Sequence, residues 1–216
     1  MRIYYNKQKI MKERVIKKIL LINALIFFLI ALLTNAHSAK LTDIQEGEWI
    51  LGNIDAPITM IEYASLSCPH CAAFHIKTLP TIKKEYIDTG KVKLIFRHFP
   101  FNLPALQGSM ITKCVGEDLY FKYLEALFSL QKKWVKSEGS RESLFNIMSN
   151  TGMTREEFDE CLNNKDIENK ILSNQIRAHE EYNIKTTPSF IINGKLIEGN
   201  KSIDTFRKTF DSILSN

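Results

Sequence analysis

Two cysteines, Cys68 and Cys71, enclose Pro69 and His70 in a Cys-Pro-His-Cys motif. The motif follows an apolar, β-branched run and precedes a stretch with helical periodicity, so we expect it at the start of a helix. At the start of a helix, unpaired backbone N–H groups and the positive end of the helix dipole stabilise a Cys68 thiolate. Pro69 suits the first helical turn, where a backbone N–H is not needed. His70 adds a hydrogen-bond donor or a positive charge beside the sulfur. A disulfide whose reduced form is stabilised in this way is a strong oxidant. The motif therefore predicts a redox-active Cys68–Cys71 pair that passes its disulfide to other proteins.

Three other interpretations of the motif are weaker. A zinc site usually needs four ligands in two pairs; His75 could join the motif, but the remaining cysteines, Cys114 and Cys161, are 47 residues apart. A structural bridge across two residues constrains almost nothing, because the stabilisation grows with loop length. A Cys-His hydrolase needs one nucleophile and a distant base rather than paired cysteines. We therefore expect no metal at this site.

The elements around the motif alternate between strand and helix. Residues 58–64 and 91–99 are predicted strands, and residues 72–88 between them are a predicted helix that Pro80 should kink. This order favours a parallel strand pair with a right-handed crossover. The chain before and after the helical segment should therefore form one sheet.

Residues 103–182 are predicted to be mostly helical. Ser140 is expected to cap a short helix ending near Gly152, and Thr154 begins a capping box that Glu157 completes. We expect this segment to form a block of helices between two parts of the sheet.

The strand pattern returns near the C-terminus. Residues 188–192 and 195–199 flank Asn193-Gly194, a pair that is a strong signal for a tight hairpin. Residues 202–214 then have apolar side chains along one side of a predicted helix. The C-terminal part should therefore add a hairpin and a helix to the sheet.

The first 39 residues have the order of a secretory signal peptide. Basic residues precede an apolar run from Ile19 to Leu33, and the small residues Ala36, Ser38 and Ala39 follow. We expect cleavage within residues 36–39; the alternative is an uncleaved membrane anchor, although the run is shorter than the ~20 residues that a spanning helix needs. Either way we expect the rest of the chain in the periplasm, where disulfides persist.

Composition and net charge exclude several other classes of protein. Hydrophobic residues make up 44% of the 216 residues and charged residues 25%, which is ordinary for a globular protein rather than a disordered or multispanning one. The formal net charge is +5, but seven basic residues and one acidic residue lie within residues 1–39, which leaves 22 basic and 23 acidic residues. With a net charge of −1, that remainder has no basic excess for nucleic acid, and we expect no nucleic-acid partner.

The motif and one downstream segment together resemble the DsbA family of thioredoxin-fold thiol:disulfide oxidoreductases. The downstream segment is Thr186-Thr187-Pro188-Ser189-Phe190, and the resemblance covers roughly residues 45–214. It implies an α/β, thioredoxin-like fold made of residues 40–102 and 183–216, with an inserted helical domain at residues 103–182.

The resemblance also implies roles for single residues. Cys68 is the exposed nucleophile that forms the mixed disulfide, and Cys71 is its more buried partner. Pro69 and His70 set the redox poise. Pro188 follows a cis peptide bond, and Thr187 and Pro188 shape the face that holds the substrate backbone.

Glu62 lies six residues before Cys68, within the apolar run. Strand alternation places it on the same side as Met60 and Ala64. The resemblance implies a buried acid at this spacing, which could exchange a proton with the Cys71 sulfur. The alternative is an edge residue that faces water.

Cys114 and Cys161 fall in the helical block. In an exported protein two extra cysteines most often pair, and a bridge over 47 residues contributes about 3–4 kcal/mol to stability. The alternatives are two free buried thiols or a second redox relay.

The remaining histidines and tryptophans are expected to be surface or packing residues rather than ligands: His75, His98, His179, Trp49 and Trp134.

These patterns predict an exported enzyme that donates a disulfide to newly translocated, unfolded proteins. We expect it to need no metal or organic cofactor, and the resemblance implies re-oxidation by a DsbB-like membrane protein. The alternatives are an isomerase or reductase of the same fold, or a periplasmic peptide-binding chaperone. Residues 40–50 are too short for the dimerisation domain typical of an isomerase, so we expect a monomer.

Overall fold

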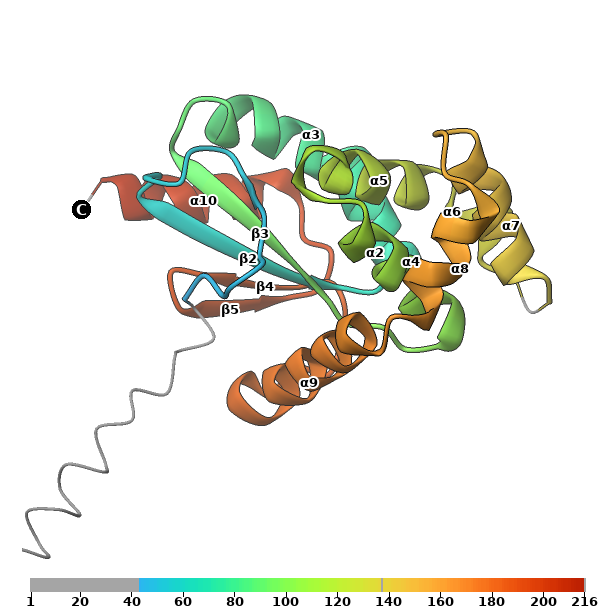
Figure 1. Ribbon diagram of the computed structural model, residues 1–216. Coiled ribbons are helices and arrows are strands. Elements are labelled where there is room, and N and C mark those ends of the chain that lie inside the picture. Colours follow the sequence, from blue (N-terminus) through green and yellow to red (C-terminus); the bar gives the residue numbers. More distant parts are fainter. Residues whose placement is uncertain (1–42, 137, 216) are drawn as a thin grey trace, which may run out of the picture. The chain divides into compact units, whose positions relative to one another are not determined.

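A computed structural model describes residues 43–136 and 138–215 (Figure 1). The predicted signal peptide lies outside the described residues. A five-stranded sheet has the order β1-β3-β2-β4-β5, in which β2 and β3 are parallel and the other neighbours are antiparallel. The strands are β1 (Ile50–Leu51), β2 (Ile58–Ala64), β3 (Val92–His98), β4 (Ser189–Ile192) and β5 (Lys195–Glu198). The predicted parallel pair and C-terminal hairpin are confirmed, whereas the two-residue β1 was missed.

The connection from β2 to β3 is one continuous helical run of four segments. These are α2 (Pro69–Ala73), the π-helical η1 (Phe74–Thr78), α3 (Leu79–Ile82) and the π-helical η2 (Lys83–Ile87). The run begins at Pro69 rather than at residue 72, because proline suits a first turn where no donor is needed. Pro80 lies in the first turn of α3, directly after η1. The missing N–H of Pro80 is thus accommodated by a wider π-helical turn before it.

The helices between β3 and β4 form the block that the sequence predicted. They are α4 (Leu103–Cys114), α5 (Glu117–Ser129), α6 (Gln131–Trp134), α7 (Ser140–Ser149), α8 (Arg155–Asn163) and α9 (Lys165–Tyr182). The capping box of Thr154 and Glu157 is present at α8. Ser140 is the first residue of α7 rather than its cap, which is Gly139 at a φ of 69°. The Ser140 hydroxyl instead donates to the carbonyl oxygen of Lys136 and accepts from the N–H of the same residue.

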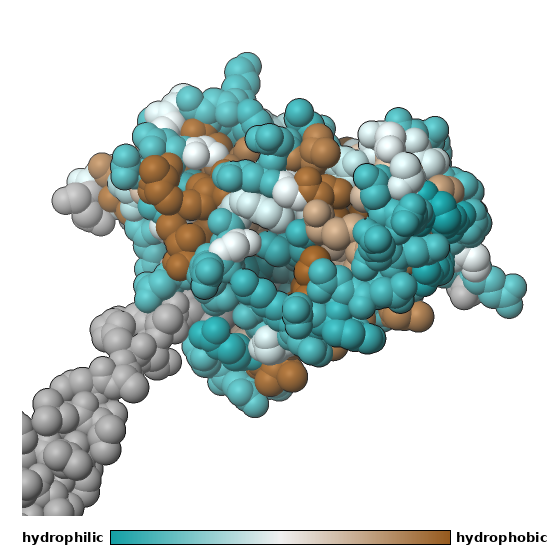
Figure 2. Space-filling view, in the orientation of Figure 1, coloured by the Kyte–Doolittle hydropathy of each residue, from teal (hydrophilic) through white to brown (hydrophobic). Residues whose placement is uncertain are grey.

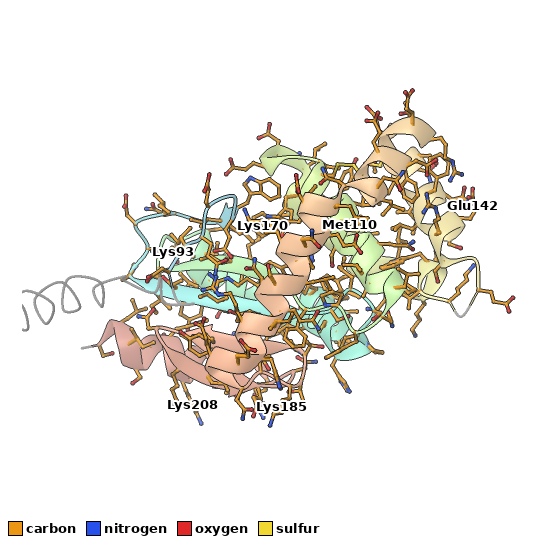
Figure 3. All side chains as sticks on the ribbon, turned by 60° about the horizontal axis from the view of Figure 1, so that its bottom comes forward. Lys93, Met110, Glu142, Lys170, Lys185 and Lys208 are labelled. Atoms are coloured by element: carbon orange, nitrogen blue, oxygen red, sulfur yellow. A yellow bond between two sulfur atoms is a disulfide. The ribbon has the colours of Figure 1, made fainter. Side chains whose placement is uncertain are left out.

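The two faces of the sheet are covered by different helices. On one face Phe74 and Ile82 of the helical run pack with Phe206 and Phe210 of α10 (Ile203–Leu214). On the other face α9 lies across the sheet and contributes Ala178 (Figure 3). Glu62, like Met60 and Ala64, belongs to the first face, so it lies under the helical run that carries the two cysteines.

A third cluster of buried side chains lies among the helices and extends to the motif. Trp134 is fully buried, and its indole N–H donates to the carbonyl oxygen of Leu127. Cys71 and Leu66 belong to the same cluster. A Cβ on Gly108 would come within 3.0 Å of Leu66 and Trp134, so this glycine allows α4 to pack closely against the motif. Packing in the helical block and the position of the cysteines are therefore linked.

Within residues 43–136 and 138–215, no helix has both the length and the apolar character needed to cross a membrane.

Candidate active site

Cys68 occupies the N-cap position of α2, directly after the turn that follows β2. Its backbone is extended, with φ −81° and ψ 120°, and the helix begins at the next residue, Pro69. Cys68 is partly exposed and Cys71 is buried, and both thiols are free in the structure. Pro69 and His70 are exposed beside them. One sulfur can therefore be reached by a large thiol substrate, and the other is shielded.

The pKa of Cys68 is lowered from the ordinary 9.0 to about 5. The largest cause is a hydrogen bond from the Cys71 thiol, which outweighs the opposing effect of partial burial. Thr187 and the backbone N–H groups of Cys71 and His70 lower the pKa further. The helix N-terminus thus acts as predicted, but residue 70 acts through its backbone rather than its imidazole. At neutral pH Cys68 is a thiolate.

The pKa of Cys71 moves in the opposite direction. Burial is the main cause of the rise, followed by the hydrogen bond with Cys68 and the negative charge of Glu62. The reduced pair therefore consists of an accessible thiolate and a buried thiol that keeps its proton. The two sulfurs can therefore do different chemistry. Cys68 can form a disulfide with a thiol of another molecule, and Cys71 can close or open the internal disulfide.

The loop before β4 brings Thr187 and Pro188 to the cysteines. The peptide bond between these two residues is cis. Cys68 Sγ lies 3.3 Å from the carbonyl oxygen of Thr187 and, while protonated, donates a hydrogen bond to it. The Thr187 hydroxyl is buried and has no hydrogen-bond partner among the described residues. Two segments 119 residues apart in the sequence thus meet at the reactive sulfur.

An open depression of about 500 Å³ adjoins the motif and this loop. It is lined by His70, Thr186, Thr187, Glu198, Gly199 and Asn200. Cys68 does not line it, but Thr187, whose carbonyl oxygen lies 3.3 Å from Cys68 Sγ, does.

Glu62 is fully buried, which excludes the alternative of a water-facing edge residue. Both of its carboxylate oxygens lie close to His75 Nε2, at 3.1 and 3.0 Å. The ring of His75 also stacks on Phe128, with a centroid distance of 4.0 Å. The prediction of a packing role for His75 was therefore incomplete, because it missed the carboxylate. His75 follows Cys71 by four residues in a helical run, and that spacing could have indicated a shared face.

Gln131 is a further residue that the sequence interpretation missed. Its buried side-chain amide donates to the carbonyl oxygens of Leu66, at 2.8 Å, and of Cys68, at 3.0 Å. It comes from α6 and lies 63 residues from Cys68. Nothing in the local pattern around Gln131 indicates this contact.

The other two cysteines form a disulfide that joins the end of α4 to α8. Their sulfur atoms are 2.03 Å apart, and the Cα atoms of Cys114 and Cys161 are 5.8 Å apart. Neither sulfur is free, in contrast to the motif cysteines.

The remaining histidines and tryptophans have packing or surface positions. His98 is buried, with Nε2 3.0 Å from the Tyr120 hydroxyl, and His179 is exposed on α9. Trp49 packs against Tyr120, and Lys113 Nζ lies 4.1 Å from the centre of the Trp49 ring. Among the residues that the structure describes, no group of three or more His, Cys, Asp or Glu side chains is arranged to hold a metal ion.

Known proteins are similar to this chain in sequence and in fold. The thioredoxin family pattern matches residues 45–212. A Rickettsia conorii protein, provisionally named a protein-disulfide oxidoreductase, is 34% identical over 172 residues. That match covers 79% of this chain but only 62% of the relative, so this chain spans less than two thirds of its length. A probable disulfide bond formation protein D of Bacillus anthracis is 32% identical over 76% of this chain and 77% of its own.

Solved structures point to the same family. The crystal structure of Wolbachia pipientis alpha-DsbA1 superposes with a TM-score of 0.76 at 33% identity. The match covers 81% of this chain and 94% of the Wolbachia chain. The fold, the motif at the start of a helix and the proline loop facing it agree with these similarities. The chain belongs to the DsbA family of thioredoxin-fold thiol:disulfide oxidoreductases.

Proposed function

We propose that this protein is an exported thiol:disulfide oxidoreductase that donates the Cys68–Cys71 disulfide to newly translocated proteins. The observation that supports this most is the lowered pKa of Cys68, about 5. A thiolate that is stable in the reduced protein makes the disulfide easy to reduce, and hence a strong oxidant of substrate thiols. The same property makes Cys68 a good leaving group.

The donation proceeds in two exchanges. A substrate thiolate attacks Cys68 Sγ, the bond to Cys71 breaks, and Cys71 leaves with the electron pair and takes up a proton. A second substrate thiolate then attacks the substrate sulfur of the mixed disulfide, and Cys68 leaves as a thiolate. The substrate loses two electrons, which the cysteine pair gains. No metal or organic cofactor is needed, because the electrons pass between sulfur atoms.

We assign each remaining site residue a role in these steps. Pro69 and His70 start the helix whose N–H groups stabilise the Cys68 thiolate. Thr187 and Pro188 hold the substrate backbone beside Cys68, at the rim of the open depression. Glu62 accepts and returns the proton of Cys71, as its effect on the pKa of that thiol supports.

The surface offers apolar side chains for an unfolded substrate. Phe101 and Leu103, in the loop and helix after β3, are 53% and 64% exposed. On the face shown in Figure 2, apolar side chains form patches separated by hydrophilic ones. Since the parallel strands β2 and β3 end at the same edge of the sheet, the segment after β3 and the motif after β2 lie along that edge. An unfolded chain with exposed apolar residues suits such a surface.

The same proposal includes the export of the protein, its domain organisation, its re-oxidation and its oligomeric state. Residues 1–39 direct export to the periplasm, and residues 103–182 form a domain inserted into the thioredoxin-like one. The Cys114–Cys161 bridge stabilises that inserted domain. A DsbB-like membrane protein re-oxidises the reduced pair, and the enzyme acts as a monomer.

The reduction potential of the pair tests this function. The purified protein is equilibrated with glutathione buffers of graded potential, and the fraction of Cys68–Cys71 disulfide is counted by mass spectrometry after thiol trapping. We expect a couple more oxidising than glutathione. A couple more reducing than glutathione would rule out the donor role and favour a reductase. Cys68→Ser is the control for a chaperone, since prevention of aggregation that survives this substitution does not depend on disulfide exchange.

A further inference from the structure

Glu62 and His75 form a buried, hydrogen-bonded pair whose carboxylate raises the pKa of the Cys71 thiol. The Glu62 side chain is 0% exposed and that of His75 is 7% exposed. His75 Nε2 lies within 3.1 Å of both carboxylate oxygens. Among the described residues, no other side chain is within hydrogen-bond distance of these oxygens. The geometry of the carboxylate therefore depends on one histidine.

Apolar rings enclose this pair. In the sheet Glu62 is flanked by Phe96 of β3 and Phe190 of β4. The ring of His75 lies against Phe96 at a centroid distance of 5.7 Å and on Phe128 at 4.0 Å. A carboxylate among such side chains is costly in free energy unless a hydrogen-bonded partner compensates it. His75 is the partner that the structure supplies.

Few other titratable groups face Glu62. From α2 the group is Cys71, whose pKa the Glu62 charge raises. From α5 it is Tyr120, whose pKa is raised mainly by burial and also by Glu62. Tyr120 also bonds His98 of β3, at 3.0 Å from Nε2. Of these groups Cys71 is the one whose proton must move during disulfide exchange.

The proton count of the pair follows from its surroundings. With one shared proton the pair is neutral overall, whichever of the two residues holds it; with none it is negative, and with two it is positive. Apolar walls oppose a net charge on the pair, so a proton that enters at Glu62 is balanced by one that leaves at His75. Since Glu62 is sealed from water and His75 has a small exposed edge, a proton that the pair exchanges with water passes through His75.

We propose that His75 is a positioning residue of the disulfide exchange, which holds Glu62 against Cys71 and passes protons between that carboxylate and water. This inference rests on the proposed function and names a residue that the family resemblance did not. The step that depends on it is the resolution of a mixed disulfide at Cys68. Cys71 gives its proton to Glu62 while His75 releases one to water, so the net charge of the pair does not change. The Cys71 sulfur then attacks Cys68 Sγ, and the bond from Cys68 to the partner sulfur breaks. The partner leaves as a thiolate that keeps the two electrons of the broken bond.

Oxidised glutathione is a suitable probe of this step. The reduced protein is mixed with it, samples are quenched with acid over time, and the mixed disulfide at Cys68 is counted by mass spectrometry from pH 5 to pH 10. His75→Gln keeps an N–H donor for Glu62 but cannot carry the proton. We expect it to slow resolution about 100-fold at neutral pH, the lower end of what a proton-transfer group contributes. The deficit should shrink at high pH, where hydroxide can remove the proton of Cys71.

A double-mutant cycle separates proton transfer from packing. Glu62→Gln alone should slow the same step, and adding His75→Gln should then change nothing further, because the two residues act as one unit. His179→Gln, the same substitution on the exposed surface of α9, should keep the wild-type rate. A His75→Gln rate that equals wild type at every pH overturns the proposal. So does a loss that is independent of pH and additive with Glu62→Gln, since that is the signature of a packing role.

A measurement on the unmutated protein guards against variants that do not fold. The His75 ring is titrated by NMR in the oxidised and in the reduced protein. If His75 and Glu62 exchange a proton with Cys71, the His75 midpoint should differ between the two redox states; identical midpoints overturn the proposal. Failure of the proposed function looks different, because the Cys68–Cys71 couple would then be more reducing than glutathione, whatever the effect of His75 on the rate of resolution.

Discussion

Gln131 Nε2 lies 3.0 Å from the carbonyl oxygen of Cys68 and donates a hydrogen bond to it. The same nitrogen donates to Leu66, 2.8 Å away. The carbonyl of Cys68 also accepts the first hydrogen bond of α2, from the N–H of Ala72. A helix of the α4–α9 block therefore fixes the turn that presents the reactive sulfur.

Replacing Gln131 tests this link. Gln131→Ala removes the side-chain donor from the buried carbonyl oxygen of Leu66 and leaves that of Cys68 with the N–H of Ala72 alone, so we expect the free energy of unfolding to fall by about 1–3 kcal/mol. Denaturant unfolding of the oxidised protein measures the loss. Gln175→Ala is the matched control, because Gln175 donates one hydrogen bond, to Pro100, from a less buried site. An effect of Gln131→Ala no larger than that of the control would contradict the role given to Gln131.

The Cys114–Cys161 disulfide should contribute to stability through the loop of 47 residues that it closes. In a Cys68→Ser/Cys71→Ser background, replacing both of its cysteines by serine should lower the free energy of unfolding by about 3–4 kcal/mol. Denaturant unfolding with and without reductant measures this. Reductant should destabilise the background protein and leave the four-serine variant unchanged. If reductant has no effect on the background protein, the bridge does not stabilise the fold.

Thr187→Val removes a hydroxyl that lowers the pKa of Cys68 and keeps the shape of the side chain. This hydroxyl is buried and has no nitrogen or oxygen partner among the described residues, so its loss should affect the motif sulfurs rather than the rest of the fold. We expect the pKa of Cys68 to rise, the couple to become less oxidising, and stability to change little. Alkylation rates and glutathione equilibria measured on the same samples would show this. An unchanged pKa would mean that Thr187 acts only through its backbone.

The stability of the reduced protein should depend on pH through Cys68. Its pKa falls from 9.0 unfolded to about 5 folded, so between these values the folded protein holds a thiolate where the unfolded chain binds a proton. The stabilisation is therefore full above about pH 9, declines as the pH falls, and is lost below about pH 5. We expect the difference in free energy of unfolding between reduced wild type and reduced Cys68→Ser to shrink across that range. A difference that stays constant would mean that Cys68 has the same pKa in both states.

Local patterns predicted the parts of the site that depend on neighbours in the sequence. The start of α2 at the motif follows from Pro69 and from the free N–H groups of a helix end. Strand alternation placed Glu62 on the same side as Met60 and Ala64, whereas its burial was implied by the family resemblance rather than by the local pattern. Asn193-Gly194 predicted the hairpin, because a tight turn needs residues that adopt positive φ; both do, at 44° and 87°.

Contacts between distant segments were not predictable in the same way. Gln131 reaches Cys68 only because Trp134 and Gly108 pack α6 and α4 against the motif. The spacing of His75 from Cys71 indicates a shared helix face, but it does not show that Glu62 lies beneath that face. The main cause of the low pKa of Cys68 was also missed: the sequence pointed to the helix end, whereas the hydrogen bond from Cys71 contributes most.

The pH dependence of Cys68 alkylation tests the central claim most directly. The wild-type protein is reduced, treated briefly with iodoacetamide from pH 3 to pH 10, and the label on the Cys68 peptide is counted by mass spectrometry. Since only the thiolate reacts, the half-maximal rate marks the pKa. The structure predicts a midpoint near pH 5. A midpoint near 9, the value of an ordinary thiol, would contradict the claim that this sulfur is held as an anion and that its disulfide is given away.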